Sequence, residues 1–535
     1  MLGGPGWEIP PRTSKFIEWM GISMLSRRDS LLALMALPLL TPRDVFAAGG
    51  VNPFTLGVAS GTPRSDSVIL WTRLAVDPLR GGGMPRGRAE VRWTVWQDAE
   101  RRRVFREGRT WTSDADAHSI HVKLDGLQPG REYWYQFSFG DAQSAVGRTR
   151  TSSPLDREAK LALASCNAWE SGHFAAFADM AEWTPDCVIH IGDYIYEGGI
   201  GRLGVNTRKV GGRDFTSETV RLHNSPEIKS LWDYRNRYAL YKSDPSLQAA
   251  HLAAPWLVAM DDHEIDNNWA GDMPEDPDQQ TPLEFKVRKL AAMKAYYEHM
   301  PIDRPPAING LEASLPMYGA FRFGPALVHL LDTRQFRSDQ PCGQGFPGDA
   351  ACDAMNDQAL TMTGGEQERW LLDSLKRSDA AFNVLASQTW FAPYRYNAPP
   401  EAPRVNMDQW DGYGVQRQRI IDALADGVSN PVVLSGDWHA AAAMRIHQRP
   451  FDARSARVGH NLCGTSVSSN CPWAGAMEDA KTFNAHVDYV DGTKRGYIRS
   501  TVAGGNWLAS YRTVDAPTDP ASRCSTAIEM RTRDL

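Results

Sequence analysis

The chain has 535 residues, too many for one hydrophobic core, so we expect two or more domains. Its 42% hydrophobic and 23% charged residues are typical of a soluble globular protein. A formal net charge of −6 argues against nucleic acid or an anionic membrane as the main partner. We expect a monomer that binds no nucleic acid.

The first 48 residues have the pattern of an export signal. A twin-arginine motif, S-R-R-D-S-L-L, occupies residues 26–32, an apolar run spans 31–40, and small residues suited to cleavage follow at 45–48. This predicts the twin-arginine export machinery as a partner, a periplasmic or extracellular location, and Met24 as the start. A short membrane anchor is the alternative, but the run is too short to span a bilayer. No other apolar run approaches that length, so the mature protein should have no transmembrane helix.

An oxidising destination permits disulfides. Cys342 and Cys352, ten residues apart in a Gly-rich segment, are the pair that we favour. The remaining cysteines leave the count odd, and their connectivity is not readable from the sequence.

Residues 51–154 have the pattern of an all-β module. Aromatic and branched residues dominate the segments 68–73, 89–96 and 132–139, and turn residues separate them. The segment L-Q-P-G-R-E-Y, which ends at Tyr133, resembles the tyrosine corner of immunoglobulin-like and fibronectin-type sandwiches. We therefore predict an N-terminal β-sandwich in which Tyr133 is structural.

Residues 155–535 instead alternate between strand and helix patterns. Strands are predicted at 160–165, 187–191, 255–260, 321–324, 326–331, 382–386, 431–434, 440–446, 458–467 and 497–502. Helices are predicted at 174–181, 283–299, 365–376 and 415–425. This favours an α/β (α+β) domain in which mixed sheets pack face to face with helices outside. We expect 198–214, rich in Gly and Arg, to be a loop at the rim.

Four of the predicted strands end in groups that bind metals. The candidates follow the strands in chain order: Cys166; Asp193 and Tyr196; Asp261, Asp262 and His263, with Asn267 and Asn268 after them; and Asp437 and His439. Ligands bind at the carboxyl ends of strands in open α/β sheets. Because buried adjacent acids repel each other, a cation is the simplest compensation.

The ligand types indicate which cations would fit. A thiolate, a phenolate and an imidazole favour a Lewis-acidic iron, Fe³⁺, whereas an all-oxygen set suits Ca²⁺, Mg²⁺ or Mn²⁺. Asp193 is placed to bridge the two sites, and a shared water would then lose a proton near neutral pH.

Purely structural interpretations remain for several of these residues. Cys166 could be a small buried hydrophobe, Asp261 could brace its loop, and 437–439 could be a turn with a surface histidine. Cys187 and His190 lie within a strand and fit a core or supporting role. Serine-hydrolase and P-loop motifs are absent from the sequence.

The motif order G-D-x-x-Y, D-D-H-E and G-D-x-H resembles the calcineurin-like metallophosphoesterases, and its variants resemble the PhoD-like alkaline phosphatase family. A thiolate in the first motif (L-A-S-C, 163–166), the L-D-T-R-Q segment at 331–335 and the N-P-F-T-L-G-V-A-S-G segment at 52–61 extend the resemblance over nearly all of the mature chain. It implies a four-layer αββα metallophosphoesterase domain over 155–535, after the sandwich at 51–154.

The resemblance also implies roles for individual residues. Cys166, Asp193, Tyr196 and His439 would bind iron, and Asp262 and Asp437 would hold one or two calcium ions. His263 would contact phosphate, with Asn268 beside it. Gln388 stands where related enzymes carry a metal-binding histidine.

The expected reaction is hydrolysis of a phosphate ester by a metal-bridging oxide or hydroxide, with Asp193 and His263 in catalytic positions. Arg334 either clamps the phosphate or pairs with Asp332. A phosphodiesterase of the phospholipase D reaction type is the near alternative, and a non-catalytic cell-surface binding protein is the remote one. The substrate class stays open among small-molecule, lipid and polymer phosphate esters.

Overall fold

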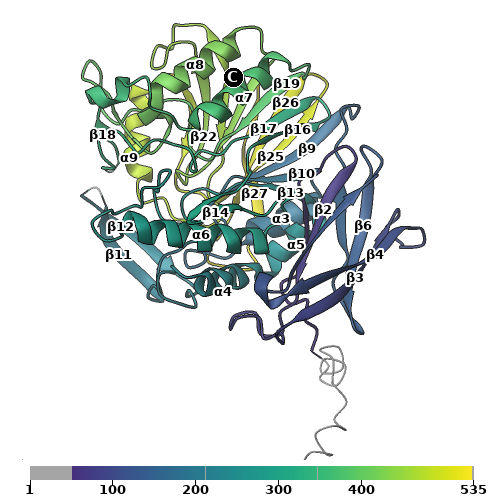
Figure 1. Cartoon of the computed structure of the whole chain (residues 1–535). Coiled ribbons are helices and arrows are strands. Elements are labelled where there is room, and N and C mark those ends of the chain that lie inside the picture. Colours follow the sequence, from purple (N-terminus) through teal and green to yellow (C-terminus); the bar gives the residue numbers. More distant parts are fainter. Residues whose placement is uncertain (1–50, 211, 346, 533–535) are drawn as a thin grey trace, which may run out of the picture. The chain divides into compact units, whose positions relative to one another are not determined.

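The computed structural model describes residues 51–210, 212–345 and 347–532, so the predicted signal peptide lies outside the described residues (Figure 1). Two large sheets carry the core. The first has nine strands, in the spatial order β27 (Cys524–Arg531), β26 (Asn506–Val514), β25 (Gly496–Ala503), β9 (Glu158–Ala164), β10 (Cys187–His190), β13 (Pro255–Val258), β1 (Val58–Gly61), β2 (Ser67–Arg73) and β5 (Ser119–Asp125). Its centre, β9–β10–β13–β1, is parallel.

The second large sheet has seven strands and a parallel centre of its own, β17–β19–β21–β23. Its spatial order is β16 (Gly319–Phe323), β17 (Ala326–Leu330), β19 (Phe382–Ala386), β21 (Pro431–Ser435), β23 (Arg457–Cys463), β22 (Ala441–His447) and β24 (Val487–Asp491). The strands predicted in this part of the chain are confirmed, with small shifts at their ends.

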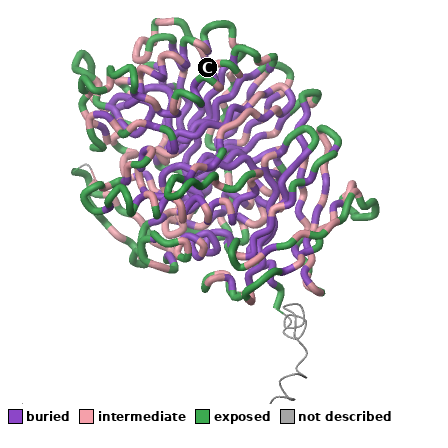
Figure 2. Tube along the Cα trace, in the orientation of Figure 1, coloured by how far each residue is buried: buried purple, intermediate pink, exposed green. Residues whose placement is uncertain are grey.

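Alternate residues of the strands show how the layers stack. Along β19, Val384 and Ala386 join the apolar cluster that also contains Leu163 of β9, whereas Leu385 joins the cluster that contains Leu371 of α7. One face of the seven-stranded sheet therefore packs on the nine-stranded sheet and the other on helices. Together with helices on the outer face of the nine-stranded sheet, this gives the expected αββα order. The strands of these inner layers are buried in Figure 2.

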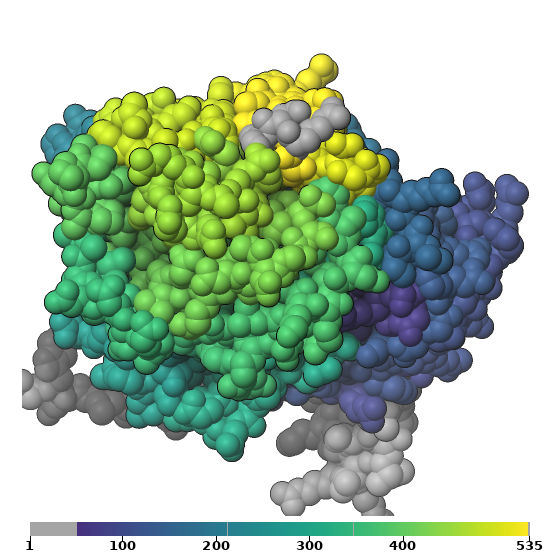
Figure 3. All heavy atoms as spheres, turned by 90° about the horizontal axis from the view of Figure 1, so that it is seen from above, coloured from purple at the N-terminus to yellow at the C-terminus, as the bar shows by residue number. Residues whose placement is uncertain are grey.

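The helices have the bounds α3 (Ala175–Trp183), α4 (Leu231–Lys242), α5 (Pro245–Ala253), α6 (Pro282–His299), α7 (Gly364–Lys376), α8 (Gly414–Ala425) and α9 (Ala474–Ala480). Local chemistry sets several of their starts: Thr281 and Glu284 form a capping box ahead of α6, and Asp244 caps α5. In the view of Figure 3, the chain segments that carry α7 and α8, coloured green, cover much of the visible face.

The N-terminal strands divide between two sheets. β1, β2 and β5 extend the nine-stranded sheet through the parallel pair β1–β13. The other strands form a five-stranded sheet: β4 (Val104–Ser113), β3 (Arg88–Trp96), β6 (Glu132–Phe139), β7 (Ala142–Gln143) and β8 (Gly147–Arg150). One side of the predicted sandwich is thus continuous with the nine-stranded sheet, and the domain boundary at 154/155 stays a prediction.

The tyrosine corner is confirmed. Tyr133 is fully buried, and its hydroxyl accepts a hydrogen bond from the backbone N–H of Gln128 at 2.9 Å. The predicted disulfide between Cys342 and Cys352 is present as well. Within the described ranges, no helix has both the length and the apolarity needed to cross a bilayer.

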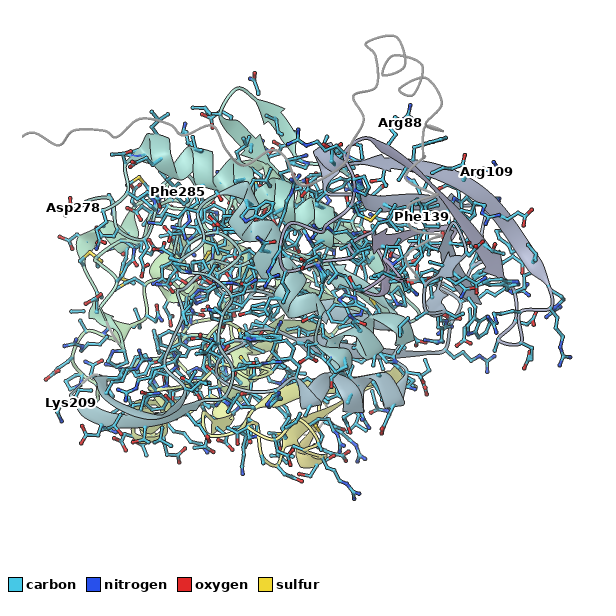
Figure 4. The ribbon with its side chains drawn as sticks, turned by 90° about the horizontal axis from the view of Figure 1, so that it is seen from below. Arg88, Arg109, Phe139, Lys209, Asp278 and Phe285 are labelled. Atoms are coloured by element: carbon cyan, nitrogen blue, oxygen red, sulfur yellow. A yellow bond between two sulfur atoms is a disulfide. The ribbon has the colours of Figure 1, made fainter. Side chains whose placement is uncertain are left out.

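The prediction of a loop at 198–214 is wrong in part. Seven register pairs join β11 (Gly204–Val210) to β12 (Arg213–Thr219) in a hairpin, in which Val, Thr and Phe residues favour a strand. Lys209 lies on this hairpin, and Arg88 and Arg109 lie on the five-stranded sheet (Figure 4). Two smaller ribbons pair β14 (Ala307–Asn309) with β15 (Glu312–Ser314) and β18 (Asp349–Ala350) with β20 (Arg404–Val405).

Candidate metal centre

The carboxyl ends of parallel strands from both sheets bring the predicted ligands together. Cys166 follows β9, Asp193 follows β10, Asp262 follows β13, and Asp437 and His439 follow β21. Their ligand atoms form three groups, and within each group the atoms lie within 4.8 Å of one another. The groups are Cys166, Asp193 and His439; Asp193, Asp262 and His263; and Asp261, Asp262 and Asp437. Because Asp193 and Asp262 each belong to two groups, the three form one continuous cluster.

Two glycines allow the strand ends to approach this closely. A Cβ atom on Gly192, whose φ is +111°, would lie 2.3 Å from the Cβ of Asp261. A Cβ on Gly436 would lie 2.4 Å from the Oγ of Ser165. The glycines in the G-D-x-x-Y and G-D-x-H motifs are therefore required by close packing between two loops.

Several ligand residues have a backbone conformation that non-glycine residues rarely adopt. The φ angles of Cys166, Asp193, Asp437 and His439 are 61°, 56°, 63° and 54°, all in the left-handed region. Each such residue costs on the order of 1–3 kcal/mol, and such residues cluster at functional sites. Four of them at three strand ends indicate that the fold holds these side chains in place against local preference.

The first group has a sulfur, a carboxylate and an imidazole, and the phenol of Tyr196 lies against two of them. The hydroxyl of Tyr196 lies 2.9 Å from Oδ2 of Asp193 and 3.1 Å from Nε2 of His439. Nδ1 of His439 donates to the carbonyl oxygen of Asn470 at 2.6 Å, which leaves Nε2 as the lone-pair nitrogen that faces the group. The hydroxyl of Ser469 lies 2.6 Å from that of Tyr196. The structure thus brings together the side chains that were predicted as the first ligand set.

The second group pairs carboxylates with His263. Nδ1 of His263 lies 2.7 Å from Oε2 of Glu197, whose other oxygen accepts the backbone N–H of Asn267 at 3.0 Å. Burial lowers the pKa of His263, but the charges of Glu197, Asp262 and Asp193 outweigh it and hold this pKa well above 6.5. The acids around His263 therefore favour its protonated form.

The third group lies against a buried arginine. Nε of Arg334 donates to Asp261, and its two terminal nitrogens each donate to one oxygen of Asp408 at 2.8 Å. The nearest distance from Arg334 to Asp262 is 3.8 Å, and that to Asp437 is 3.9 Å. The alternative prediction, a side-chain pair with Asp332, is wrong: Asp332 accepts the backbone N–H of Arg334, and its other donors are the backbone and the side chain of Gln335.

This arrangement leaves Arg334 fully buried with its guanidinium fork bound to carboxylates. Its predicted contact with phosphate has no support in this geometry. Asp261, held by Arg334, has the bracing role given above as the alternative to ligation, whereas Asp262 and Asp437 remain available to a cation.

The residues of this cluster fit cations. Oδ1 of Asp193 and Oδ1 of Asp262 are buried and have no hydrogen-bond donor among the described residues. Burial, and then neighbouring acids, raise the pKa of Asp437 well above 3.8, and burial raises the pKa of Asp193 in the same direction despite His263. Burial likewise raises the pKa of the Cys166 thiol. Cations within the groups would give the orphaned oxygens a partner and stabilise the charged forms.

Three other predicted residues have supporting positions. The backbone N–H of Asn268 donates to Asp262 at 2.8 Å, and its side chain donates to Gln344 at 3.1 Å. Gln388 is buried and bonded to the Thr333 hydroxyl and to the Leu331 carbonyl, so its amide joins the ends of β17 and β19. Nε2 of His190 lies 2.8 Å from Oδ1 of Asn167, which supports the loop after β9.

Sequence reasoning missed several residues that shape the centre. Asp408 binds Arg334, Gln409 donates to Asp437, and Ser469 and Asn470 contact Tyr196 and His439. These four lie in loops without a motif, so the sequence held no signal for them. Glu197 did have a signal, because it directly follows the G-D-x-x-Y motif.

Comparisons with known proteins agree with this geometry. The family model described as PhoD-like phosphatase matches residues 161–511, and that of the PhoD-like phosphatase N-terminal domain matches residues 42–153. Alkaline phosphatase D of Bacillus subtilis (strain 168) is 41% identical over 485 residues, which cover 89% of this chain and 80% of that protein. A solved structure of PhoD matches with a TM-score of 0.83 and 40% identity over 90% of each chain. These matches confirm the resemblance found in the motifs, and the chain belongs to the PhoD-like phosphatase family.

Proposed function

We propose that this protein is a metal-dependent phosphatase that hydrolyses small phosphate esters at the three linked ligand groups. The observation that carries the proposal is the sharing of Asp193 and Asp262 between neighbouring groups, each with a buried oxygen that lacks a donor among the described residues. The similarity to alkaline phosphatase D supports the same reaction.

Iron is the cation we propose for Cys166, Asp193, Tyr196 and His439, because a thiolate and a phenolate favour it. Calcium, with Mg²⁺ or Mn²⁺ as the alternatives, is proposed for Asp262 and Asp437, with Asp193 shared between the two sites. When bound, these cations supply Lewis-acid chemistry and the acidity that a water nucleophile needs.

The protein's own groups supply the remaining steps. Glu197 accepts the Nδ1–H of His263 and favours its doubly protonated form, in which the Nε2–H is available to the phosphoryl oxygens or to the departing alcohol. Asn268, whose backbone N–H donates to Asp262, is proposed to contact the substrate, and its amide is held by Gln344. Arg334 orients Asp261 and keeps its positive charge close to Asp262. In this proposal it does not contact the substrate.

We also propose export through the twin-arginine pathway, on the basis of the S-R-R-D-S-L-L motif at 26–32. The disulfide Cys342–Cys352 supports an oxidising destination. Replacing both arginines of the motif with lysine should retain the protein in the cytoplasm of an expressing bacterium, as fractionation would show. Unchanged export of that variant contradicts the route.

The proposed activity is tested by elemental analysis and by hydrolysis of a chromogenic monoester and a chromogenic diester. Asp193→Asn should lose both bound iron and turnover, whereas Asp233→Asn, a change in the exposed capping box of α4, should keep both. Tyr196→Phe should remove any visible phenolate-to-iron absorption. Full iron content and full activity in Asp193→Asn would end the proposal, and the ratio of the two substrates separates a monoesterase from a diesterase.

A further inference from the structure

One short segment, residues 466–470, lies against the site proposed for iron. It follows β23, and its backbone bonds to the loop after β9, where the N–H of Val467 donates to the carbonyl of Ser165 at 3.0 Å. The carbonyl of Cys166 accepts the backbone N–H of Ser469 at 3.2 Å and lies 2.7 Å from the hydroxyl oxygen of the same residue. These bonds stabilise Cys166 in its left-handed conformation, which has a φ of 61°.

The hydroxyl of Ser469 also contacts a second residue of that site. Its oxygen lies 2.6 Å from the oxygen of Tyr196, and it accepts the backbone N–H of Ala168 at 3.2 Å. Because a serine hydroxyl has a single proton, that proton goes to the carbonyl of Cys166 or to the oxygen of Tyr196. One fully buried side chain therefore joins two of the proposed ligands to each other.

Arg495 fixes the position of Ser469. It lies directly before β25 and is 5% exposed. Its Nη1 donates to the hydroxyl of Ser466 at 2.7 Å and to the backbone carbonyl of Ser469, and its Nη2 donates to the carbonyl of Gly492. Because a buried cation is costly unless it is well hydrogen-bonded, these bonds favour a single arrangement of the segment that carries Ser469.

We propose that Ser469 is a positioning residue for the cation that binds at Cys166 and Tyr196, and that Arg495 acts on this site through Ser469. The inference rests on the proposed function, because that function places a cation there. Groups that orient the ligands of a metal typically change its affinity about 10- to 100-fold when they are removed. The alternative is that both residues serve only the stability of the fold.

Competition between the cobalt-loaded protein and a chelator tests this inference without depending on turnover. Co²⁺ accepts thiolate and imidazole ligands, and a thiolate-to-cobalt absorption band reports its binding by a cysteine. The Cys166→Ser protein should lack the band, which assigns it to Cys166 among the five free cysteines. Ser469→Ala should weaken Co²⁺ binding about 10- to 100-fold and shift the band, because the orientation of the ligands changes.

Ser468→Ala is the matched control. Ser468 is as fully buried as Ser469, but its hydroxyl donates to the carbonyl of Ala168 at 2.9 Å instead of to a ligand residue. Its affinity for Co²⁺ should equal that of the unaltered protein within the error of the titration, and the band should stay in place. Equal effects of the two serine variants on cobalt binding, or an unchanged affinity in Ser469→Ala, would overturn the proposal.

Arg495→Lys tests whether the arginine acts through Ser469. Lysine cannot reproduce the forked bonds of the guanidinium, so this variant should weaken Co²⁺ binding to a similar degree as Ser469→Ala. The double variant should then bind Co²⁺ no more than about twofold less tightly than Ser469→Ala alone. Effects that multiply would show that Arg495 acts independently of Ser469 and contradict that part of the proposal. The two serine variants decide the role of Ser469 even where Arg495→Lys does not fold.

The same preparations separate this inference from the proposed function. A protein that shows Ser469-dependent cobalt binding but hydrolyses no phosphate ester contradicts the function and leaves the positioning role in place. An active phosphatase whose Ser469→Ala variant binds Co²⁺ as the unaltered protein does contradicts the positioning role alone. If the Cys166→Ser protein keeps the band, the proposed ligand set is wrong and both proposals fall together.

Discussion

The carboxylate of Glu264 accepts the backbone N–H of Asp193 at 3.0 Å, although 71 residues separate the two in the chain. The same carboxylate accepts the backbone N–H groups of Tyr194 and Asp261, so one buried acid joins the loop after β10 to the loop after β13. Glu264 belongs to none of the three ligand groups. The spacing of the groups therefore depends on a residue that we expect to bind no cation.

Glu264→Ala should leave three buried N–H groups without an acceptor, at a cost of about 1–3 kcal/mol each when fully unpaired. We expect the free energy of unfolding to fall by about 3–5 kcal/mol and the metal content to fall with it. Glu264→Gln keeps one acceptor oxygen and should lose less. Denaturant titration and elemental analysis measure the two effects.

The control for this prediction is Glu284→Ala, which removes an exposed carboxylate that also accepts a backbone N–H. Its effect on the unfolding free energy should be much smaller, and its metal content should be normal. If Glu264→Ala resembled this control, the link between the two loops would have no energetic importance.

Arg334→Lys distinguishes bracing of the acids from contact with phosphate. Lysine cannot reproduce the two-pronged bond to Asp408, and breaking a buried pair of this kind costs about 3–5 kcal/mol. We expect a lower free energy of unfolding and fewer bound cations, while KM of the remaining active enzyme changes by less than about threefold, because phosphate binding is not lost.

Arg419→Lys is the matched comparison, since Arg419 makes the same two-pronged bond to Glu368 but is 40% exposed. It should leave stability and cations nearly unchanged. A stable Arg334→Lys protein whose KM rises tenfold or more would restore the role of phosphate clamp.

The sequence pointed to the candidate ligands because buried parallel strands are apolar runs, and the polar residue after each run stands out. Cys166, Asp193, Asp262 and Asp437 all have that signal. The disulfide and the tyrosine corner were predictable for a similar reason, since their partners are ten and five residues apart.

Relationships between distant segments were not predictable in the same way. Asp408 binds Arg334 from 74 residues away and lies in a loop with no periodic pattern. The pairing of β1 with β13 joins the N-terminal strands to the nine-stranded sheet, and no local feature of either strand specifies that partner. Gly192 and Gly436 were visible as turn residues, but the close approach that requires them became evident only from the packed loops.

Metal removal should make stability strongly dependent on pH. Without cations, burial raises the pKa of Asp261 to about 7 and that of Glu264 to about 8, and the pKa values of Asp193 and Asp437 also lie above 3.8. An acid whose pKa is higher in the folded than in the unfolded protein stabilises the fold at low pH. This stabilisation is complete below the pKa of the unfolded protein, and it is lost as the pH rises through the pKa of the folded protein.

The chelated protein should therefore lose several kcal/mol between about pH 4 and pH 8, at 1.36 kcal/mol for each unit of pKa shift. The cation-loaded protein should lose much less, so the difference between their Tm values should widen as pH rises. Differential scanning calorimetry at pH 5, 7 and 9 measures that difference. A constant difference across this range would show that the buried acids are not compensated by cations.

Glu197→Gln should move the pH dependence of catalysis through His263. The charge of Glu197 is the largest of the influences that raise the pKa of His263, and glutamine removes it while keeping an oxygen acceptor. Since the proposed role of His263 requires its protonated form, the basic limb of the kcat/KM profile should shift at least about one unit to lower pH. At pH 9 the rate should then fall about tenfold or more, with near-normal activity at pH 6. Glu275→Gln removes a charge that contacts Asn267 at 2.6 Å and acts on His263 only from farther away, so it should shift the limb much less. Equal shifts in both variants, or a loss in Glu197→Gln that is uniform at every pH, would exclude a proton held on His263 by Glu197.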